Sequence, residues 1–214
     1  MRTALVTGAT GFLGGHLVRR LMQDGWRVRA LVRGDSRSRG LPEGVTAVAG
    51  DLTRPSALGG VTAGVEVVFH AAAATASAFS SGARHEKLFM SVNRDGTEAI
   101  AREAARAGAR FVHVSSTAAM GLAGSSDGET IDETSPLLPT TPYGRSRKMA
   151  EEVVAALCRS ADLDSVVLRP CTIAGPGNDG GDVMLLVRMA GLGAVPVVEG
   201  RAGAIKPIVV VVAG

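Results

Sequence analysis

Three glycines near the start of the chain have the spacing that suits phosphate binding. Gly8, Gly11 and Gly14 follow the short apolar run Thr3 to Val6 and open a helix-like pattern. A strand that turns through glycines into a helix points backbone N–H groups and the positive end of the helix dipole at one spot. The first glycine permits the turn, the second lets phosphate approach, and the third lets helix and strand pack closely. The spacing predicts a pyrophosphate site; an ordinary strand-to-helix turn is the alternative.

The rest of the chain alternates apolar runs with helix-like segments. The apolar runs are nearly continuous, as in strands that are covered on both faces. The expected strands are Ala4–Val6, Val28–Val32, Val45–Ala49, Val65–Phe69, Arg110–Val114 and Ser165–Leu168. The expected helices are Phe12–Gln23, Ser56–Gly60, Arg84–Ala107 and Tyr143–Ser160. Alternation with right-handed crossovers predicts an α/β protein with a doubly wound parallel sheet, the Rossmann fold. The polar stretch Ser125–Pro142 predicts a long loop of the kind that often covers a site.

Composition narrows the possible classes of protein. The 214 residues are 46% hydrophobic and carry a net charge of +3, which fits one domain with at most a small appendage. Arginines cluster between Arg27 and Arg39 without aromatic residues among them, so nucleic-acid binding is not expected. No apolar run approaches the roughly 20 residues that span a bilayer, and the N-terminus enters the first strand without room for a signal peptide. We therefore expect a cytoplasmic protein with neither nucleic-acid nor membrane partners.

Cysteines and histidines give no sign of a metal or a disulfide framework. Cys158 and Cys171 are the only cysteines, and we expect both to be reduced thiols. The histidines at positions 16, 70, 85 and 113 lack the spacing of metal ligands. We interpret them as structural or surface residues and expect no metal.

Seven motifs occur between residues 2 and 177 in the order of one enzyme family. They are VTGATGFLG, GDLT at Gly50–Thr53, HAAA at His70–Ala73, VNRDGT at Val92–Thr97, VSST at Val114–Thr117, YGRSR at Tyr143–Arg147 and LRPCTIAGPG at Leu168–Gly177. The chain resembles an extended short-chain dehydrogenase/reductase of the NAD(P)-dependent epimerase/dehydratase and dihydroflavonol-reductase-like type. The resemblance implies an NAD(P)-binding domain over residues 1–177 and a short or truncated substrate-binding lobe over residues 178–214. It also implies a small-molecule substrate and a homodimer.

The resemblance places the cofactor on the glycine turn and at the ends of later strands. Asp51 follows the third expected strand, at the carboxyl edge where ligands bind in open α/β sheets. The resemblance implies that Asp51 and Leu52 border the adenine, and small alanines would let the cofactor pass over the backbone. A helix-capping aspartate and plain helix-forming alanines are the alternatives. The expected cofactor-binding residues are Gly8, Thr10, Gly11, Phe12, Leu13, Gly14, Arg33, Asp51, Leu52, Ala71, Ala72, Ala73 and Pro170.

Arg33 bears on the choice between NADP and NAD. It closes the second expected strand, where NAD-preferring folds often place an acidic residue for the ribose 2′-hydroxyl. An arginine suits a 2′-phosphate instead, because it can clamp the phosphate with two hydrogen bonds. NADP(H) is therefore expected, with NAD as the alternative. Asp35 nearby opposes this preference, and a solvated surface arginine is the other interpretation.

The catalytic motif departs from the family at one position. The usual pattern is a tyrosine with a lysine four residues later, on one face of a helix, and the cation makes the hydroxyl a better proton donor and acceptor. Tyr143 is the only tyrosine, but Arg147 stands at the lysine position. Lys148, one residue further on, should be turned away from Tyr143. Arginine is not a conservative replacement, so reduced or altered activity is expected.

Two further residues complete the expected active site. Thr117 best matches the hydroxyl that orients the substrate oxygen, with Ser115 and Ser116 as alternatives. Asn93 lies within an expected helix, an unfavourable place for asparagine, and the family places a supporting asparagine there.

These observations predict an NADP(H)-dependent oxidoreductase that transfers hydride to or from a carbonyl or alcohol carbon, as a reductase, epimerase or dehydratase. In this hypothesis Tyr143 is the acid/base, Thr117 orients the substrate oxygen and Arg147 supplies positive charge. A non-catalytic dinucleotide-binding sensor or scaffold is the alternative, because of Arg147 and the short C-terminal part. The valine run Val209–Val212 predicts an exposed apolar edge.

Overall fold

The structure is a computed structural model that describes residues 1–34, 40–75, 82–121, 131–178, 182–192 and 208–209. It divides into two compact units, Met1–Arg169 and Pro170–Gly214. We describe each unit by itself. The expected boundary after residue 177 stays a prediction.

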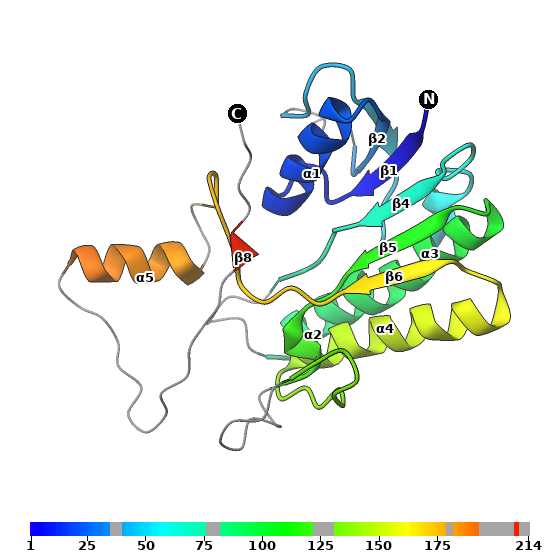
Figure 1. The fold of residues 1–214 in the computed structure, drawn as a ribbon. Helices are drawn as coiled ribbons and strands as arrows, with labels where there is room; N and C mark the ends of the chain where they lie inside the picture. Colours follow the sequence, from blue (N-terminus) through cyan, green and yellow to red (C-terminus); the bar gives the residue numbers. More distant parts are fainter. Residues whose placement is uncertain (35–39, 76–81, 122–130, 179–181, 193–207, 210–214) are drawn as a thin grey trace. The chain divides into compact units, whose positions relative to one another are not determined.

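The first unit is built on a six-stranded sheet (Figure 1). Its strands are β1 (Thr3–Thr7), β2 (Arg27–Val32), β3 (Thr46–Ala49), β4 (Val67–His70), β5 (Arg110–Val114) and β6 (Ser165–Leu168). They lie in the order β3-β2-β1-β4-β5-β6, and every neighbouring pair is parallel. This is the Rossmann order, which reverses between β1 and β4. The expected doubly wound parallel sheet is confirmed.

The connections between strands are mostly helical. They are α1 (Phe12–Gln23), the 3₁₀ turn η2 (Pro55–Leu58), α2 (Ala83–Phe89), the π-helical turn η3 (Met90–Asp95), α3 (Gly96–Arg106), the 3₁₀ turn η4 (Thr117–Ala119) and α4 (Pro142–Ser160). The single helix expected over residues 84–107 thus contains a π-helical turn around Asn93. Such turns are rare and occur frequently at functional sites.

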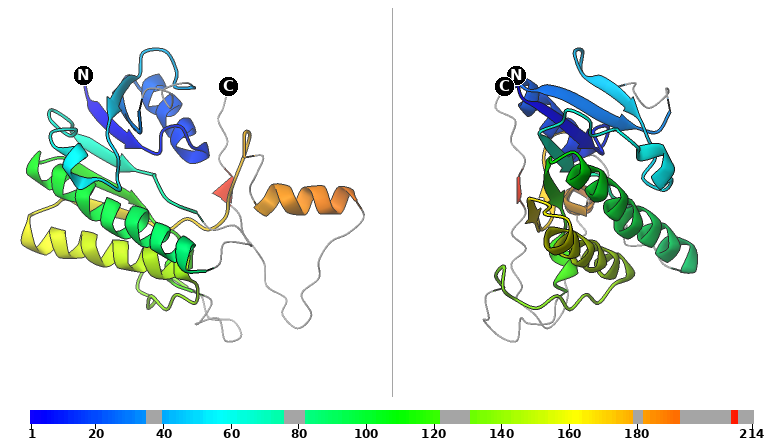
Figure 2. Two further views of the ribbon diagram at one scale, coloured as in Figure 1. Left: turned by 180° about the vertical axis from the view of Figure 1, so that it is seen from behind. Right: turned by 90° about the vertical axis from the view of Figure 1, so that its right-hand side faces the viewer.

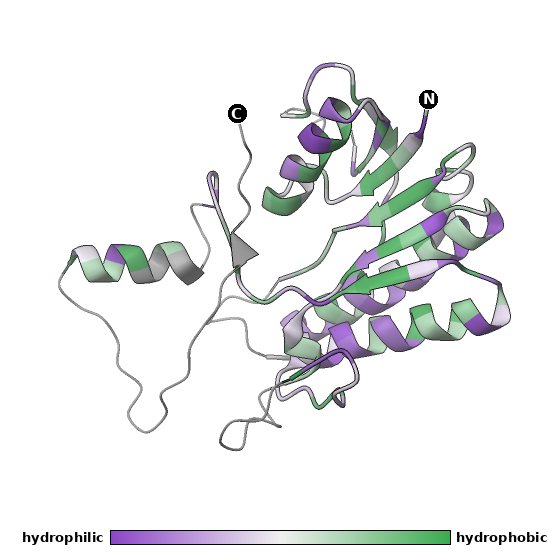
Figure 3. Ribbon diagram, in the orientation of Figure 1, coloured by the Kyte–Doolittle hydropathy of each residue, from purple (hydrophilic) through white to green (hydrophobic). Residues whose placement is uncertain are grey.

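Side-chain alternation divides the core between the two faces of the sheet. On β1, Leu5 belongs to a buried cluster with residues of α3 and α4, whereas Ala4 and Val6 belong to a cluster with residues of α1. Figure 2 shows α1 on one face of the sheet and α3 and α4 on the other. Figure 3 shows that the strands are mostly hydrophobic, while the helices mix both kinds of residue. This pattern is typical of parallel strands that are covered on both faces.

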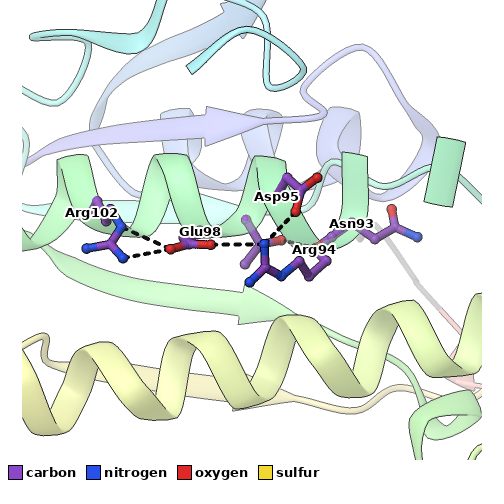
Figure 4. A network of polar contacts seen from close by, with 6 residues as sticks. Asn93, Arg94, Asp95, Glu98 and Arg102 are labelled. Atoms are coloured by element: carbon purple, nitrogen blue, oxygen red, sulfur yellow. Dashed lines mark hydrogen bonds and ion pairs between the residues drawn. The ribbon is translucent and has the colours of Figure 1, made fainter. Parts of the chain in front are cut away.

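Ion pairs line the exposed side of η3 and α3 (Figure 4). Arg94 Nη1 lies 2.7 Å from Asp95 Oδ1 and 3.3 Å from Glu98 Oε2, and Arg102 Nη2 lies 2.6 Å from Glu98 Oε1. Solvent screening makes such pairs worth little, about 0.3–0.5 kcal/mol each. Asn93, on the same stretch of helix, is fully buried.

The second unit is described only in part. Its strands β7 (Ile173–Ala174) and β8 (Ile208–Val209) pair in parallel, and α5 spans Asp182–Gly191. The valine run expected to form an apolar edge extends to Val212 and lies mostly outside the described residues. Of the loop expected over residues 125–142, residues 125–130 also lie outside them, as does Asp35. Within the part of the chain that the structure describes, no helix has the length and apolar character needed to cross a membrane.

Candidate active site

The glycine turn joins β1 to α1. Gly8 has φ +70°, and a Cβ on it would lie 2.7 Å from the backbone nitrogen of Ala72. Gly11 donates its N–H to the Gly8 carbonyl at 2.9 Å and is the N-cap residue of α1. No described side chain caps this helix, and its first turn carries no acidic residue. The free N–H groups at the start of α1 therefore suit an anion.

The edge beside the turn is open. Thr10 and Gly11 are exposed, and Phe12 and Leu13 are half-buried. The segment that follows β4 lies next to the turn, because the backbone N–H of Ala72 donates to Thr7 Oγ1 at 3.1 Å. Ala71, Ala72 and Ala73 are half-buried in this segment. The glycine turn and the alanine backbone beside it form a cradle that fits a dinucleotide pyrophosphate.

Gly14 offers a sharp test of this cradle. A Cβ at Gly14 would lie 2.6 Å from the Gly8 carbonyl carbon and 3.0 Å from Ala9 Cα, whereas one at Gly15 would find only ordinary contacts, the nearest at 3.6 Å. Gly14→Ala is expected to push α1 off the turn and weaken NADPH binding about tenfold or more. The neighbouring Gly15→Ala is expected to keep binding and to raise helix stability by about 0.5–1 kcal/mol. Calorimetric titration with NADPH measures both, and equal affinities in the two variants would contradict the cradle.

Asp51 and Arg33 lie near each other at the ends of β3 and β2. Asp51 Oδ1 accepts hydrogen bonds from the backbone N–H of Thr53 at 2.9 Å and from its hydroxyl at 2.8 Å. The pKa of Asp51 is lowered, chiefly by the backbone bond from Thr53, with smaller contributions from Arg33 and Arg54. The 3₁₀ turn η2 has Arg54 as its N-cap residue, without a side-chain hydrogen bond, so Asp51 does not cap it. Arg33 is exposed.

Leu52, also expected at the cofactor, is buried and packs closely on the helix opposite. A Cβ on Gly96 would lie 2.8 Å from Leu52 Cβ. Leu52 therefore fixes the distance between this loop and α3. Pro170 begins the second unit.

One face of α4 carries the expected catalytic residues. Tyr143, Arg147 and Glu151 are spaced four residues apart, which places them on one side of the helix. Thr141 caps the helix, since its side chain accepts the N–H of Gly144 at 3.0 Å. A Cβ on Gly144 would clash with the Ala118 carbonyl, so the start of α4 approaches η4 closely. The sequence thus brings Tyr143 toward the turn that begins with Thr117.

The three hydroxyls after β5 differ in their contacts. Ser115 is buried and donates its hydroxyl to Glu151 Oε1. Ser116 accepts the N–H of Ala118 at 3.1 Å and caps η4. Thr117 is exposed. Since the two serines hold the local structure, this geometry favours Thr117 for substrate contact.

Arg147 is buried, with 1% of its surface exposed. Its Nη2 donates to the Val114 carbonyl, but Nε and Nη1 lack hydrogen-bond partners within the described structure. Burial lowers the pKa of Arg147, and Tyr143 and Glu151 partly oppose this effect. An arginine nevertheless remains charged at neutral pH. Helix α4 therefore carries a permanent cation whose Nε and Nη1 donors have no partner within the described structure. Lys148 Nζ instead lies 3.8 Å from Glu152, on a more exposed side of α4.

Several residues of this region were not singled out from the sequence. Arg169 holds Glu151 in an ion pair, with Nη2 2.8 Å from Oε2. Ser146 is fully buried and donates its hydroxyl to the Tyr143 carbonyl at 2.7 Å. No signal in the sequence indicates these contacts, apart from Ser146 lying within the YGRSR motif.

His70 and His113, for which the sequence predicts a structural or surface position, are both fully buried. Burial, and next the Arg147 charge, lower the pKa of His70 to about 3. Burial lowers the pKa of His113 well below its usual value, with further contributions from His70 and Arg147. Both imidazoles are therefore neutral in the folded protein at neutral pH.

The two histidines make stability depend on pH. Since the folded pKa of His70 lies at about 3 and its ordinary value is 6.5, the unfolded chain binds the extra proton between these values. The free energy of unfolding is therefore highest above pH 6.5 and falls by about 1.4 kcal/mol per pH unit per histidine as the pH drops below it. Urea unfolding at about pH 7 and about pH 5 measures the loss. His70→Gln should reduce the slope, and a flat wild-type profile would contradict the assignment.

Among the residues described, no group of three or more histidine, cysteine, aspartate or glutamate side chains is placed to hold a metal ion.

The strand order, the glycine turn and the open edge above it define a dinucleotide-binding protein of the Rossmann class. The model of the NAD dependent epimerase/dehydratase family matches residues 4–202, and the chain belongs to this family, which is of the extended short-chain dehydrogenase/reductase type. Its members include reductases, epimerases and dehydratases.

Comparisons with individual proteins agree with this family assignment. The chain is 41% identical over 176 residues to a ceramide reductase of Caulobacter vibrioides, covering 81% of this chain and 47% of that protein. It is 36% identical over 175 residues to a putative dihydroflavonol 4-reductase of Synechocystis, covering 80% of this chain and 49% of that protein. The structure of the dTDP-glucose 4,6-dehydratase DesIV from Streptomyces venezuelae, with NAD bound, matches with TM-score 0.74 and 29% identity, covering 90% of this chain and 63% of that one. The chain thus spans about half the length of the curated relatives it matches.

Proposed function

We propose that the chain is an NADP(H)-dependent oxidoreductase that transfers hydride to or from a carbonyl or alcohol carbon of a small molecule. The observation that supports this proposal most strongly is the buried Arg147 cation, which lies on the same face of α4 as the only tyrosine and has N–H groups without partners among the described residues. A buried charge with free donors is costly for stability alone. Its position beside an acid/base residue gives it a use in catalysis.

The residues divide the chemistry between them. The Tyr143 hydroxyl exchanges a proton with the substrate oxygen. Thr117 donates a hydrogen bond that orients this oxygen, and Arg147 stabilises negative charge on the phenolic oxygen. When bound, the nicotinamide supplies or accepts the hydride. The glycine turn at Gly8, Gly11 and Gly14 holds the pyrophosphate.

Arg33 supports NADP(H) over NAD(H). It is exposed at the end of β2, close enough to Asp51 to lower the pKa of that carboxyl. An exposed guanidinium at this edge is available for a 2′-phosphate. The DesIV structure, by contrast, contains NAD.

Parallel calorimetric titrations with NADPH and NADH test the proposal. The wild-type chain should bind NADPH more tightly, and Arg33→Ser should weaken NADPH binding by about tenfold while leaving NADH nearly unchanged. Arg54→Ser, a neighbouring arginine beside Asp51, is the matched control. Equal binding of both cofactors by the wild type would overturn the NADP preference. Binding of neither would overturn the dinucleotide function.

The non-catalytic sensor is supported by one observation, the Arg147 hydrogen bond to the Val114 carbonyl, which gives this arginine a structural use. Comparison of Arg147→Lys with the wild type distinguishes the two functions. A large gain in turnover would indicate an impaired enzyme, whereas no turnover in either form, with dinucleotide binding kept, would favour the sensor. The homodimer and the cytoplasmic location stay predictions.

A further inference from the structure

The sheet carries a buried polar row directly beyond an apolar one. Leu5, Val68 and Phe111 are paired across β1, β4 and β5 and are fully buried. Two residues further along each strand, on the same face, stand Thr7, His70 and His113. These three are also fully buried. A buried polar group that makes no hydrogen bond lowers the stability of the fold. A row of such groups at the carboxyl edge of a sheet therefore needs a reason beyond packing.

The contacts of His70 allow only one arrangement of its protons. Thr97 Oγ1 donates to the Asn93 carbonyl at 2.5 Å, since a carbonyl can only accept. Thr97 has then no second proton for His70 Nε2, which lies 2.9 Å away. The hydrogen must therefore be on Nε2, and His70 donates to Thr97.

The other ring nitrogen follows from the first. A neutral imidazole with its hydrogen on Nε2 has a lone pair on Nδ1. His70 Nδ1 therefore accepts the Thr7 hydroxyl at 2.7 Å. Thr7 Oγ1 in turn accepts the N–H of Ala72 at 3.1 Å. Burial and the Arg147 charge, which lower the pKa of His70 to about 3, agree with this neutral form.

The series of hydrogen bonds continues from Asn93 toward the active site. Asn93 Nδ2 donates to Ser146 Oγ at 3.0 Å, and Ser146 donates to the Tyr143 carbonyl at 2.7 Å. The Asn93 amide also exchanges two hydrogen bonds with the backbone of Ala74, at 2.8 and 3.0 Å. The backbone around Asn93 is the π-helical turn η3. The helix is therefore distorted at the residue where these hydrogen bonds cross it.

We propose that His70, with its hydrogen on Nε2, is a positioning residue that joins the glycine turn to the helix presenting Tyr143. Through Thr7 it fixes Ala72, which faces Gly8 across the cradle. Through Thr97 it fixes the carbonyl of Asn93. It thereby also positions the hydrogen bonds that run from Asn93 through Ser146 to the Tyr143 carbonyl. This role rests on the proposed function, because it matters only if the cradle holds a dinucleotide and Tyr143 acts on a substrate.

The tautomer can be measured directly. Nitrogen NMR of the labelled 214-residue chain distinguishes the two ring nitrogens of each histidine, and His70→Gln identifies the His70 signals. The expected result is a hydrogen on Nε2 and a lone pair on Nδ1. A hydrogen on Nδ1, or a charged ring at neutral pH, would overturn the proposal.

Two variants each keep half of the His70 contacts. His70→Asn places an acceptor where Nδ1 stands and keeps the Thr7 side, and His70→Gln places a donor where Nε2 stands and keeps the Thr97 side. Because Tyr143 is the only tyrosine, labelled tyrosine gives one set of ring signals that reports its position. His70→Asn should shift or broaden these signals and leave NADPH affinity within about threefold. His70→Gln should leave the tyrosine signals in place and weaken NADPH binding about tenfold.

A purely structural histidine gives a different result. It would lower stability in both variants and move both readouts together, or move neither, and either pattern overturns the proposal. If the histidine variants fail to fold, Thr97→Val and Thr97→Ser replace them, and only the serine should restore the tyrosine signals. Failure of the proposed function is distinct, since a wild type that binds neither dinucleotide still reports the tautomer and the tyrosine signals.

Discussion

Tyr143→Phe is expected to reduce turnover about 10³-fold with any carbonyl substrate that the wild-type chain reduces, within the range attributed to general acid–base catalysis. The loss follows because Tyr143 is the only tyrosine in the chain, and a phenyl ring cannot supply the proton. Phenylalanine keeps the edge-to-face contact with Phe89, whose ring centre lies 5.8 Å away. The variant should therefore fold and bind NADPH as the wild type does. Loss of NADPH absorbance over a panel of ketones and aldehydes measures the rates.

The hydroxyls after β5 give two further variants for this experiment. Thr117→Val should lower turnover without changing NADPH affinity, because Thr117 is exposed and the proposed function assigns it to the substrate oxygen. Ser115→Ala should lower stability, because its hydroxyl partner Glu151 is buried. A Tyr143→Phe variant as fast as the wild type would refute the assigned acid/base. A Ser115→Ala variant that loses turnover at full stability would move the substrate contact from Thr117 to Ser115.

The sequence predicts the strands and the glycine turn because both depend on local pattern. Apolar runs of four to six residues mark parallel strands covered on both faces, and Gly8 is needed where φ is positive. Spacing along one helix likewise predicts that Tyr143 and Arg147 share a face.

Contacts between distant strands are a different matter. His70 and His113 are 43 positions apart in the chain (113 − 70) yet paired across β4 and β5. The residues around each histidine in the sequence do not predict that it is buried near Arg147. The Ser115–Glu151–Arg169 contacts join three elements in the same way. At the π-helical turn, Asn93 makes hydrogen bonds to Ala74 and Ser146, residues that only the folded chain brings together. These parts of the site depend on tertiary pairing, so local periodicity could not reveal them.

Arg147→Met is expected to raise the free energy of unfolding by about 1 kcal/mol or more while impairing function. The guanidinium has 1% of its surface exposed and two nitrogens without partners in the described structure. Exchange of a buried, incompletely paired charge for an apolar side chain of similar length is often stabilising. Glu151 keeps its ion pair with Arg169 and its hydrogen bond from Ser115, so the substitution leaves no new buried charge unpaired. Urea unfolding at neutral pH measures the change.

Arg145→Met is the matched control, two residues away on the same helix. Arg145 is 48% exposed and lies 3.3 Å from Glu86, itself largely exposed, so its loss should change stability by less than about 0.5 kcal/mol. A destabilised Arg147→Met would mean that the hydrogen bond to the Val114 carbonyl outweighs the cost of burying the charge, and Arg147 would then be structural.

The turnover of the Arg147→Met variant tests why the chain has an arginine at position 147. If Arg147→Met is more stable and also loses turnover, the chain retains a destabilising cation for its effect on Tyr143, as active sites commonly do. Arg147→Lys separates charge from shape, because lysine keeps a cation but loses the planar fork that reaches the Val114 carbonyl. Turnover that survives in the lysine variant and disappears in the methionine variant would show that the charge is what Tyr143 requires. Turnover lost equally in both would show that the fork, and the position it gives the end of β5, is required instead.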